Sequence, residues 1–583
     1  MQKRLPLLCF FTLFFATAFA QTNYPTDYFR SPIDTSIELA GNFGEIRPNH
    51  FHAGFDIKTN GKEGMRVYAA ADGYISRIKI SPYGYGNALY ITHPNGYTSV
   101  YGHLQRFNGA IAAFLKKTQY ALQSFEVDTL LTADVLPVSK GQLIALSGNT
   151  GGSEGPHLHF EIRETATEKP INPYYFGYKI PDTVKPKITE IAIYPINGTV
   201  NGKSILKKIK PAFLKGRYFI LNKADTICVN GDIGFGIETY DTENGNQGQN
   251  GVFSIELQSG GKRVYYEELE KFSFENARYV NAHIDYAEKQ EHGDKIQKCF
   301  LSKNNQLGIY KNVINNGVLH FEDDSIHWIR YIVKDFAGNS AEMMLKIRST
   351  SRTAPAPKIN NPRTIIPEMN FDCTKENKLV RDDLQIVIPP NALYDDVYFE
   401  YSNPVLLNKQ PLPGIFSSVY LLLNADIPVQ KAYLLSIKAN KLPENLQNKA
   451  CIISINDKGK RSYEGGSFKD GYVSTQAKSF GNFAIGMDTV APKLKAAFKI
   501  IPGKTTDLSK AKTIGIVATD NLSGIRKYRG SIDGKWVLCE YELKQNLLYY
   551  TFDEQITPGT HTFSIDVTDD KANTATYTFT FKR

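Results

Sequence analysis

Three short segments in the first 160 residues carry side chains that could bind one metal ion. His52 stands four residues before Asp56, so a turn or a strand end could direct both side chains at the same point. His157 and His159 are two residues apart, and on a strand such residues face the same side. The third segment is Tyr101-Gly102-His103-Leu104. Six of the eleven histidines lie before residue 160, so this end of the chain is where we expect chemistry.

These residue types suit zinc-dependent hydrolysis. Catalytic zinc usually takes three protein ligands from His and Asp or Glu, and it leaves one position open for water. Bound zinc makes that water more acidic and polarises a scissile carbonyl. Imidazoles outside the coordination shell can accept a proton or stabilise developing negative charge. Two histidines and one aspartate as ligands, with two spare histidines, would use five of the clustered residues.

In this order the three motifs resemble the M23 family of peptidases, the LytM/lysostaphin-type endopeptidases, whose pattern is H-x-x-x-D, then Y-x-H-L, then H-x-H. The resemblance covers roughly residues 40 to 175 and includes the neighbouring segments 43–48, 67–73, 140–142 and 147–151. It implies an antiparallel β-sheet core and one Zn²⁺ per chain. It further implies a zinc metalloendopeptidase that hydrolyses peptide bonds in peptidoglycan cross-links or stem peptides.

The resemblance also implies a role for each of the five residues. His52, Asp56 and His159 would be the zinc ligands. His157 and His103 would be catalytic histidines that do not bind the metal. We expect His157 to act as general base toward the attacking water, and His103 to orient that water or to stabilise the tetrahedral intermediate.

Two further histidines lie near these motifs. His50 competes with His52 for the first ligand position, but the H-x-G-x-D context and the spacing to Asp56 favour His52. His93 precedes the turn Pro94-Asn95-Gly96 and is expected to be a structural residue at a strand end. Glycines recur nearby and are expected to shape a loop beside the metal; they are Gly148, Gly151, Gly152 and Gly155.

The elements that would position these residues are mainly short strands. Hydrophobic alternation and turn signals predict strands over 67–71, 74–78, 88–92 and 97–101. Apolar residues at helical spacing predict one amphipathic helix over 109–125. It falls in a segment, 108–134, that lengthens the chain relative to the compact family core. That segment is either a tolerated surface insertion or a wall or lid of the substrate groove.

An internal repeat marks the downstream chain. Residues 182–188 are echoed by residues 488–494, and the motif V-x-D-x-x-x-N-x-A occurs at 333–341 and again at 567–575. The repeat predicts two related immunoglobulin-like β-sandwich domains. The aspartate and asparagine of each motif could bind calcium, but we expect them to close turns through Asx hydrogen bonds.

The 583 residues are too many for one hydrophobic core, so several domains are expected. The predicted division is a signal peptide at 1–20, a peptidase domain at 21–180 and a β-sandwich at 181–350, followed by a β-rich domain of unclear type at 351–487 and a second β-sandwich at 488–583. A Pro-rich linker is predicted at 353–367. With 34 Tyr, 34 Phe and 2 Trp, the composition favours a mainly β fold.

The N-terminus predicts export. Lys3 and Arg4 precede an apolar run over residues 5–19, and Ala18-Phe19-Ala20 fits a signal-peptidase site. No later apolar run is long enough to cross a bilayer. We therefore expect a protein of the periplasm or cell envelope, or one released outside the cell. The net charge of +9 is mild for this length, and no basic–aromatic pattern points to nucleic acid.

Peptidoglycan is the expected partner, and the β-sandwich domains are candidates for binding other envelope proteins. Two alternatives to an active peptidase stand beside this one. Some members of the resembled family have lost their ligands and instead activate cell-wall amidases, so a non-catalytic regulator is the first. The second is an envelope-binding module dominated by the β-rich tail. Retention of all five residues favours the enzyme.

Overall fold

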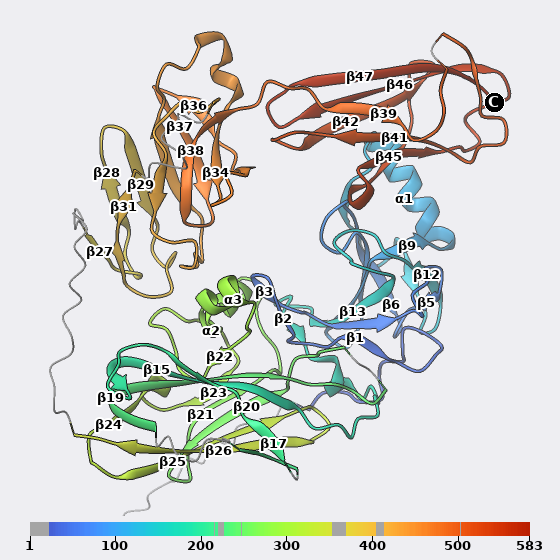
Figure 1. Cartoon of the computed structure of the whole chain (residues 1–583). Coiled ribbons are helices and arrows are strands. Elements are labelled where there is room, and N and C mark those ends of the chain that lie inside the picture. Colours follow the sequence, from blue (N-terminus) through green and yellow to red (C-terminus); the bar gives the residue numbers. More distant parts are fainter. Residues whose placement is uncertain are drawn as a thin grey trace, which may run out of the picture.

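The computed structural model describes residues 23–214, 216–219, 227–245, 248–351, 369–403, 413–501 and 503–583. The predicted signal peptide and the predicted linker at 353–367 lie outside these residues. Antiparallel strands dominate, and the longest helix is α1 (Gly109–Leu122) (Figure 1). The predicted fold class, a mainly β chain with one helix inserted in its first part, is confirmed. Within the described ranges, no helix is long and apolar enough to span a membrane.

Residues between 39 and 171 build a nine-stranded antiparallel sheet. Its main path is β1 (Leu39–Gly41), β4 (Phe55–Lys58), β13 (His157–Glu164), β8 (Tyr97–Gly102), β7 (Asn87–Thr92), β6 (Gly73–Ile80) and β10 (Val127–Leu130). Strands β11 (Pro137–Val138) and β14 (Pro170–Ile171) pair at its sides. A smaller sheet joins β5 (Arg66–Tyr68), β12 (Leu143–Ser147) and β9 (Leu104–Phe107). The four predicted strands correspond to β5, β6, β7 and β8.

Strand β13 shows how the sequence positions the site. Leu158, Phe160 and Ile162 are completely buried in the core of this domain. Burying such side chains stabilises the fold by roughly 1.5–3 kcal/mol each. Because neighbouring residues of a strand point to opposite faces, His157 and His159 must then project from the other face of the sheet. The apolar core thus fixes the direction of both histidines.

Helix α1 ends earlier than the predicted residue 125. Gln123 adopts a left-handed conformation (φ 47°) and closes the helix. Ile111 is buried in the core as predicted, but Leu122 is 61% exposed, so the apolar face is shorter than the spacing suggested. At its C-terminal end the helix contacts the last domain of the chain: the Tyr120 hydroxyl donates to Asp553 (2.7 Å), and the Tyr120 ring meets Trp536 edge-on.

The next part of the chain, here the first β-domain (187–349), is one twelve-stranded sheet around its own core. Its main path is β16 (Lys207–Ile209), β15 (Lys187–Val200), β19 (Ile227–Tyr240), β26 (Ser340–Ser349), β25 (Ile326–Lys334), β20 (Ser254–Ser259), β21 (Lys262–Glu268) and β23 (Tyr310–Val313). The short helices η2 (Ala277–Tyr279), α2 (Val280–His283) and α3 (Tyr286–His292) lie on the side of this domain that faces β2 (Ile46–Arg47) and β3 (His50–Phe51) (Figure 1).

The first β-domain and the site-bearing domain share a buried apolar cluster. Phe43 and Phe51 pack against Phe272, with ring centroids 5.1 and 5.7 Å apart. Ala53, next to His52, belongs to the same cluster as Val280 of α2. The segment that carries His52 is therefore held from both sides, by its own sheet and by the downstream domain.

The second β-domain (369–487) has two five-stranded sheets around one core. One sheet runs β28 (Asn377–Val380), β29 (Leu384–Ile388), β33 (Tyr433–Lys438), β37 (Tyr472–Ala477) and β36 (Ser467–Lys469). The other runs β31 (Tyr401–Ser402), β32 (Tyr420–Leu422), β38 (Gly481–Met487), β34 (Ala450–Ile455) and β35 (Arg461–Tyr463).

The third β-domain (493–582) is also a two-sheet sandwich. Its sheets are β39 (Lys493–Ala496), β41 (Thr513–Thr519), β45 (Leu547–Thr551) and β44 (Cys539–Glu542), and β40 (Thr506–Asp507), β47 (Thr574–Lys582), β46 (Thr560–Asp569), β42 (Ile525–Ile532) and β43 (Lys535–Trp536). Each of these three β-domains has its own hydrophobic core, and the domain division given from the sequence stays a prediction.

The sequence repeat corresponds to a structural one. In the first β-domain Asn339 donates its backbone N–H and its side-chain amide to Asp335, and its amide also reaches the carbonyl of Asp182 (3.2 Å). In the third β-domain Asn573 repeats all three bonds, with Asp569 and with the carbonyl of Asp488. The predicted Asx hydrogen bonds are confirmed, and they tie each motif to the segment that opens its domain.

Candidate metal centre

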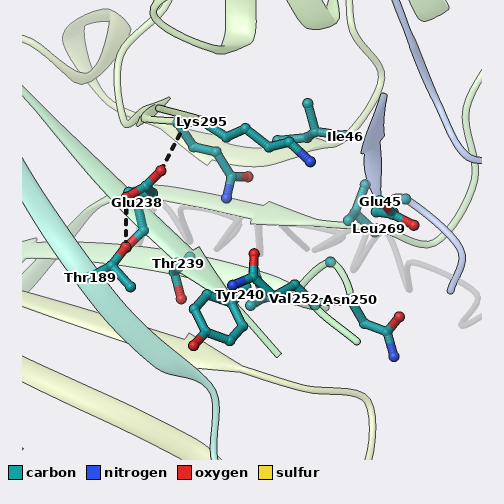
Figure 2. Close-up of a pocket in the computed structure, with 14 residues that line it drawn as sticks. Glu45, Ile46, Thr189, Glu238, Thr239, Tyr240, Asn250, Val252, Leu269 and Lys295 are labelled. Atoms are coloured by element: carbon teal, nitrogen blue, oxygen red, sulfur yellow. Dashed lines mark hydrogen bonds between the residues drawn. The ribbon is translucent and has the colours of Figure 1, made fainter. Parts of the chain in front are cut away.

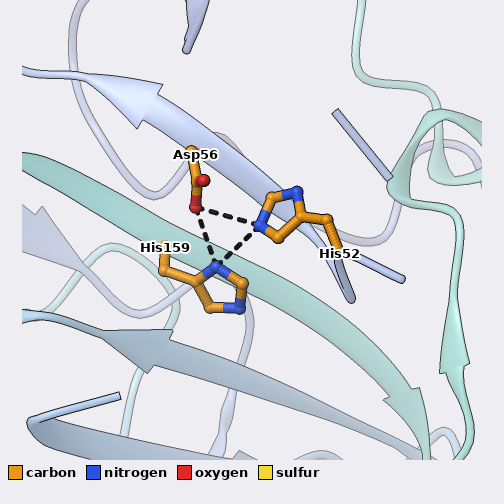
Figure 3. Close-up of side chains that lie close together, drawn as sticks. All are labelled: His52, Asp56 and His159. Atoms are coloured by element: carbon orange, nitrogen blue, oxygen red, sulfur yellow. Dashed lines mark hydrogen bonds and ion pairs between the residues drawn. The ribbon is translucent and has the colours of Figure 1, made fainter. Parts of the chain in front are cut away.

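Two paired strands and one loop bring His52, Asp56 and His159 together (Figure 3). Asp56 on β4 lies directly opposite His159 on β13 in the antiparallel register. His52 lies in the loop between β3 and β4, and its ring points toward Asp56 on β4. Paired residues on one face of a sheet lie about 5 Å apart, so the register alone places the carboxylate beside the imidazole.

The three ligand atoms converge closely. Asp56 Oδ1 lies 3.0 Å from His52 Nε2 and 2.9 Å from His159 Nδ1, and the two nitrogens are 3.0 Å apart. All three side chains are buried, with 2–4% of their surface exposed. We call these three residues the ligand cluster.

Hydrogen bonds on the far side of each ring fix the tautomers. His52 Nδ1 donates to the carbonyl of Asn42 (2.7 Å), which leaves a lone pair on Nε2. His159 Nε2 donates to Glu161 (2.7 Å), which leaves a lone pair on Nδ1. When both rings are neutral, two lone pairs and a carboxylate oxygen face one point. This donor set fits a divalent cation such as zinc.

Charge around the ligand cluster also favours a cation. Burial alone would raise the pKa of Asp56, but the three histidines around it hold that pKa well below its ordinary value. For His159, burial acts to lower the pKa, yet Asp56 and Glu161 together raise it to about 9. A metal ion would supply the positive charge that a proton on His159 otherwise supplies.

His157 and His103 lie beside the ligand cluster but are held differently. His157 Nδ1 bonds the carbonyl of Gly155 (2.8 Å), and its Nε2 lies 3.2 Å from Asp56 Oδ1 without a hydrogen bond. His103 Nδ1 bonds the carbonyl of Thr150 (2.8 Å). The two rings are 4.7 Å apart. Burial and the neighbouring histidines lower the pKa of His103 to about 3, so this imidazole is neutral at physiological pH.

The structure separates the two remaining histidines of this region from the ligand cluster. His50 is exposed on β3 and bonds only the nearby carbonyl of Pro48 (2.8 Å). His93 is buried between the carbonyl of Asp72 and the hydroxyl of Ser99, each 2.8 Å away. Both positions agree with the sequence-based expectation.

The sequence analysis did not identify the residues that support the ligand cluster. Glu161 is completely buried and joins His159 to Arg163, whose Nε lies 2.6 Å from Glu161. Alternation along β13 was the available signal, because residues 157, 159, 161 and 163 share one face. Arg47, 2.5 Å from the second oxygen of Asp56, had no such signal. The ring of Tyr85, stacked 4.8 Å from that of His159, was also missed.

The glycine-rich loop holds the two spare histidines in place through backbone carbonyls. It packs so tightly that a side-chain carbon on Gly151 (φ 71°) would lie 2.3 Å from the backbone nitrogen of Gly86. The third β-domain reaches the same loop, since the ammonium of Lys544 contacts the carbonyls of Asn149 and Ser153. The loop that the glycines were expected to shape therefore holds the rings of His103 and His157 in position.

A separate cavity lies where residues 44–46 meet the first β-domain (Figure 2). One of its charged groups, Glu238, already accepts bonds from Thr189 Oγ1 (2.8 Å) and from the backbone N–H of Lys295 (2.9 Å). None of the lining residues belongs to the ligand cluster. We therefore do not assign chemistry to this cavity.

Comparison with known proteins agrees with the motif resemblance. Residues 50–121 and 116–173 match the profile of Peptidase family M23, and residues 368–488 match that of a Zu5-like domain. The chain is 33% identical over 131 residues to the DD-carboxypeptidase/endopeptidase Mpg of Neisseria meningitidis (22% of this chain, 24% of that protein). It is 32% identical over 149 residues to the peptidoglycan DD-endopeptidase ShyA of Vibrio cholerae (24% and 28%).

Another relative is named for a different role. The chain is 32% identical over 152 residues to the murein hydrolase activator NlpD of Salmonella typhimurium (26% of this chain, 32% of that protein). Among solved structures, the catalytic domain of lysostaphin from Staphylococcus simulans matches at 24% identity and a TM-score of 0.19, covering 24% of this chain and 93% of that one. The chain spans about a quarter of the length of the curated relatives named first.

Proposed function

We propose that the M23-type domain, which includes residues 50–173, is a zinc metalloendopeptidase that hydrolyses peptide bonds in peptidoglycan cross-links or stem peptides. The observation that carries this proposal is the convergence of two imidazole lone pairs and one carboxylate oxygen at a single buried point. His52 Nε2, Asp56 Oδ1 and His159 Nδ1 would hold one Zn²⁺. When bound, zinc acidifies a water molecule and polarises the carbonyl that is attacked.

His157 is the general base in this proposal. Its Nδ1 is engaged by the carbonyl of Gly155, so the free lone pair is on Nε2, which faces the ligand cluster. A base must lie within hydrogen-bond reach of the proton that it removes, and Nε2 has this position for a water next to Asp56. The proton could later pass to the leaving amine.

His103 has the complementary role of donor or orienting group. The carbonyl of Thr150 holds its ring next to that of His157. Its lowered pKa keeps the ring neutral, so it would not repel the bound metal. A neutral imidazole at this place can orient water or stabilise negative charge on the attacked carbonyl oxygen.

The supporting residues would tune the ligands. Glu161, anchored by Arg163, orients His159 and makes its ring a stronger ligand. Arg47 engages the oxygen of Asp56 that is not directed at the two histidines, so the other oxygen stays aimed at the metal.

The same family resemblance leaves a regulator as the alternative function, as the name of NlpD illustrates. A regulator that has lost its ligands would not need five correctly placed side chains. Here all five lie in one cluster, with their tautomers set by neighbouring groups. This arrangement favours catalysis.

We further propose that the protein is exported and acts in the periplasm or envelope, with its β-domains positioning the peptidase against the cell wall. The direct test of function is cleavage of purified peptidoglycan by the zinc-loaded mature chain, with release of muropeptides measured by chromatography. Release that depends on zinc supports the enzyme. Zinc binding without any release, while a purified amidase becomes more active in the presence of the protein, would support the regulator.

A further inference from the structure

Three carboxylates meet where the M23-type domain joins the first β-domain. Asp182 precedes β15, Asp241 directly follows β19, and Asp335 directly follows β25. Each offers one oxygen, and these oxygens all lie within 4.8 Å of one another. Asp241 and Asp335 are each only 4% exposed. We call these three residues the acidic cluster.

One oxygen of the acidic cluster has no partner. Asp241 Oδ1 is buried and forms no hydrogen bond, which is costly for a group that carries negative charge. Asp335, by contrast, accepts two bonds from Asn339 at 2.8 Å. The unpaired oxygen belongs to a side chain that is almost wholly buried and is directed at two other carboxylates.

Among the described residues, no salt bridge involves the three carboxylates of the acidic cluster. Lys179 lines the cavity beside them but is exposed. A fourth acid, Glu243, is buried nearby and is bound to the Tyr174 hydroxyl. Burial, Asp335 and Asp182 together raise the pKa of Asp241 to about 8, which reflects this uncompensated repulsion.

We propose that Asp182, Asp241 and Asp335 bind one calcium ion in this joint. Calcium takes six to eight oxygen ligands at about 2.3–2.6 Å, so two oxygens bound to the same ion lie at most about 5 Å apart. The spacing of the acidic cluster meets this limit. The adjoining cavity, of about 270 Å³, has room for waters that would complete the shell. All three donor atoms are carboxylate oxygens, which suit calcium, whereas a zinc site usually includes nitrogen or sulfur ligands.

The position of the acidic cluster indicates what the ion would do. The ring of Tyr174, from the M23-type domain, stacks 4.8 Å from that of Phe336, the residue after Asp335. Asp182 lies in the segment that connects the two domains. An ion shared by Asp182 and two strand ends of the first β-domain would fix the connection, and with it the orientation of the peptidase domain.

The third β-domain contains a natural comparison. Asp488, Asp520 and Asp569 form an equivalent cluster, with the same bonds from Asn573. There, however, a lysine is buried nearby: the ammonium of Lys571 donates to the carbonyl of Gly466 (2.6 Å), and burial lowers its pKa while the charges of Asp488 and Asp569 oppose that shift. The matching position in the first β-domain, two residues after Asp335, is Ala337. Asp520 Oδ1 is also buried without a hydrogen bond, but the second cluster has a buried ammonium nearby that the first lacks, so we confine the proposal to the first.

The test is calcium titration of the zinc-loaded mature chain in buffer cleared of calcium by a chelating resin, followed by calorimetry and thermal unfolding. We expect one calcium ion per chain, with Kd in the range of about 10⁻⁴–10⁻³ M that is typical of extracellular calcium modules. The Tm should rise when calcium is added, because the ion binds only the folded state.

Two variants should abolish both effects. Asp241→Asn removes the buried charge with little change in shape, so it should fold without calcium and should show no further rise in Tm with it. Ala337→Lys introduces the ammonium that the second cluster has, and it should also lose calcium binding. If Asp241→Asn does not fold, Ala337→Lys alone decides the matter.

Asp520→Asn is the matched control in the second cluster, and it should keep calcium binding. His159→Ala should keep it as well, which separates this site from the zinc centre. The proposal is overturned if the wild type binds no calcium at 10 mM (about ten times the upper Kd expected). It is also overturned if Asp241→Asn and Ala337→Lys bind calcium like the wild type, or if Asp520→Asn is the variant that loses it.

Discussion

The ligand cluster and the acidic cluster each bring three ligand atoms together in a buried place, but they do so with different chemistry. In the ligand cluster, two imidazoles and a carboxylate are oriented by Asn42, Glu161 and Arg47. In the acidic cluster, three carboxylates meet and one oxygen is left unpaired. In our proposals this difference in donor type and supporting hydrogen bonds, more than proximity, selects the ion. It would separate a centre for chemistry from one that holds domains together.

The largest effect that would test this separation is expected from Asp56→Asn. The amide cannot supply the negative charge that draws a cation to two neutral imidazoles, so zinc should be lost from the purified protein. Peptidoglycan cleavage should fall at least about 10³-fold, because hydrolysis in this site depends on the metal. Calcium binding at the acidic cluster should be unchanged. Zinc retention in this variant, measured by elemental analysis, would break the distinction between the two clusters.

A smaller effect is expected from His103→Ala. This residue lies beside the ligand cluster without belonging to it, so zinc content should stay at the wild-type level. Loss of a group that orients water or stabilises charge should lower kcat about 10²- to 10⁴-fold. Cleavage kinetics and metal content measured on the same preparation provide the check. Equal loss of zinc and activity would make His103 a ligand and would contradict its assignment.

Glu161→Gln should weaken zinc binding without abolishing it. Glutamine keeps the shape of the side chain but weakens the hydrogen bond that orients His159, and it leaves Arg163 without its buried partner. Loss of such a supporting carboxylate typically lowers metal affinity about 10- to 100-fold. Competition with a zinc chelator gives the affinity directly. Wild-type affinity in a folded variant would mean that the support is dispensable.

The smallest expected effect is a dependence of thermal stability on pH that comes from Asp241 of the acidic cluster. Without calcium, burial and its acidic neighbours raise the pKa of Asp241 from 3.8 to about 8. The folded state then binds more protons than the unfolded state between about pH 4 and pH 8, so this group makes the protein less stable as pH rises through that window. Relative to Asp241→Asn, the Tm of the wild type should fall by a few degrees between pH 5 and pH 8.

Calcium should reverse this trend, because it favours the ionised carboxylates. Lys179 and Glu243 lie near Asp241 in both proteins, so the difference between wild type and variant isolates Asp241. Parallel Tm curves for the two proteins in calcium-free buffer would show that Asp241 does not titrate in this range.

Local sequence patterns predicted much of the ligand cluster and little of the acidic one. His157 and His159 share a strand face, and His52 and Asp56 are close in sequence, so their meeting depends on short-range geometry and one strand pairing. The end of α1 was predicted three residues late because Gln123 adopts a left-handed conformation that spacing alone does not reveal.

Long-range contacts account for what the sequence could not provide. Arg47 contacts Asp56 only because the chain between them turns back on itself. Asp241 meets Asp182 and Asp335 only after the first β-domain has folded. The repeat pointed to Asp335 and Asn339 but contained no sign of Asp241, whose counterpart Asp520 lies at a different distance along its own domain. The packing of Phe51 on Phe272 is equally a tertiary property.

Zinc content and muropeptide release, measured side by side for the wild type, His159→Ala and His157→Ala, test directly whether this domain is a zinc hydrolase. We expect about one zinc and active cleavage for the wild type, and loss of both in His159→Ala. His157→Ala should keep its zinc and lose activity, as expected of a base outside the coordination shell. A wild-type protein that binds no zinc, or a His157→Ala variant that cleaves peptidoglycan at the wild-type rate, would show that the proposed centre is wrong.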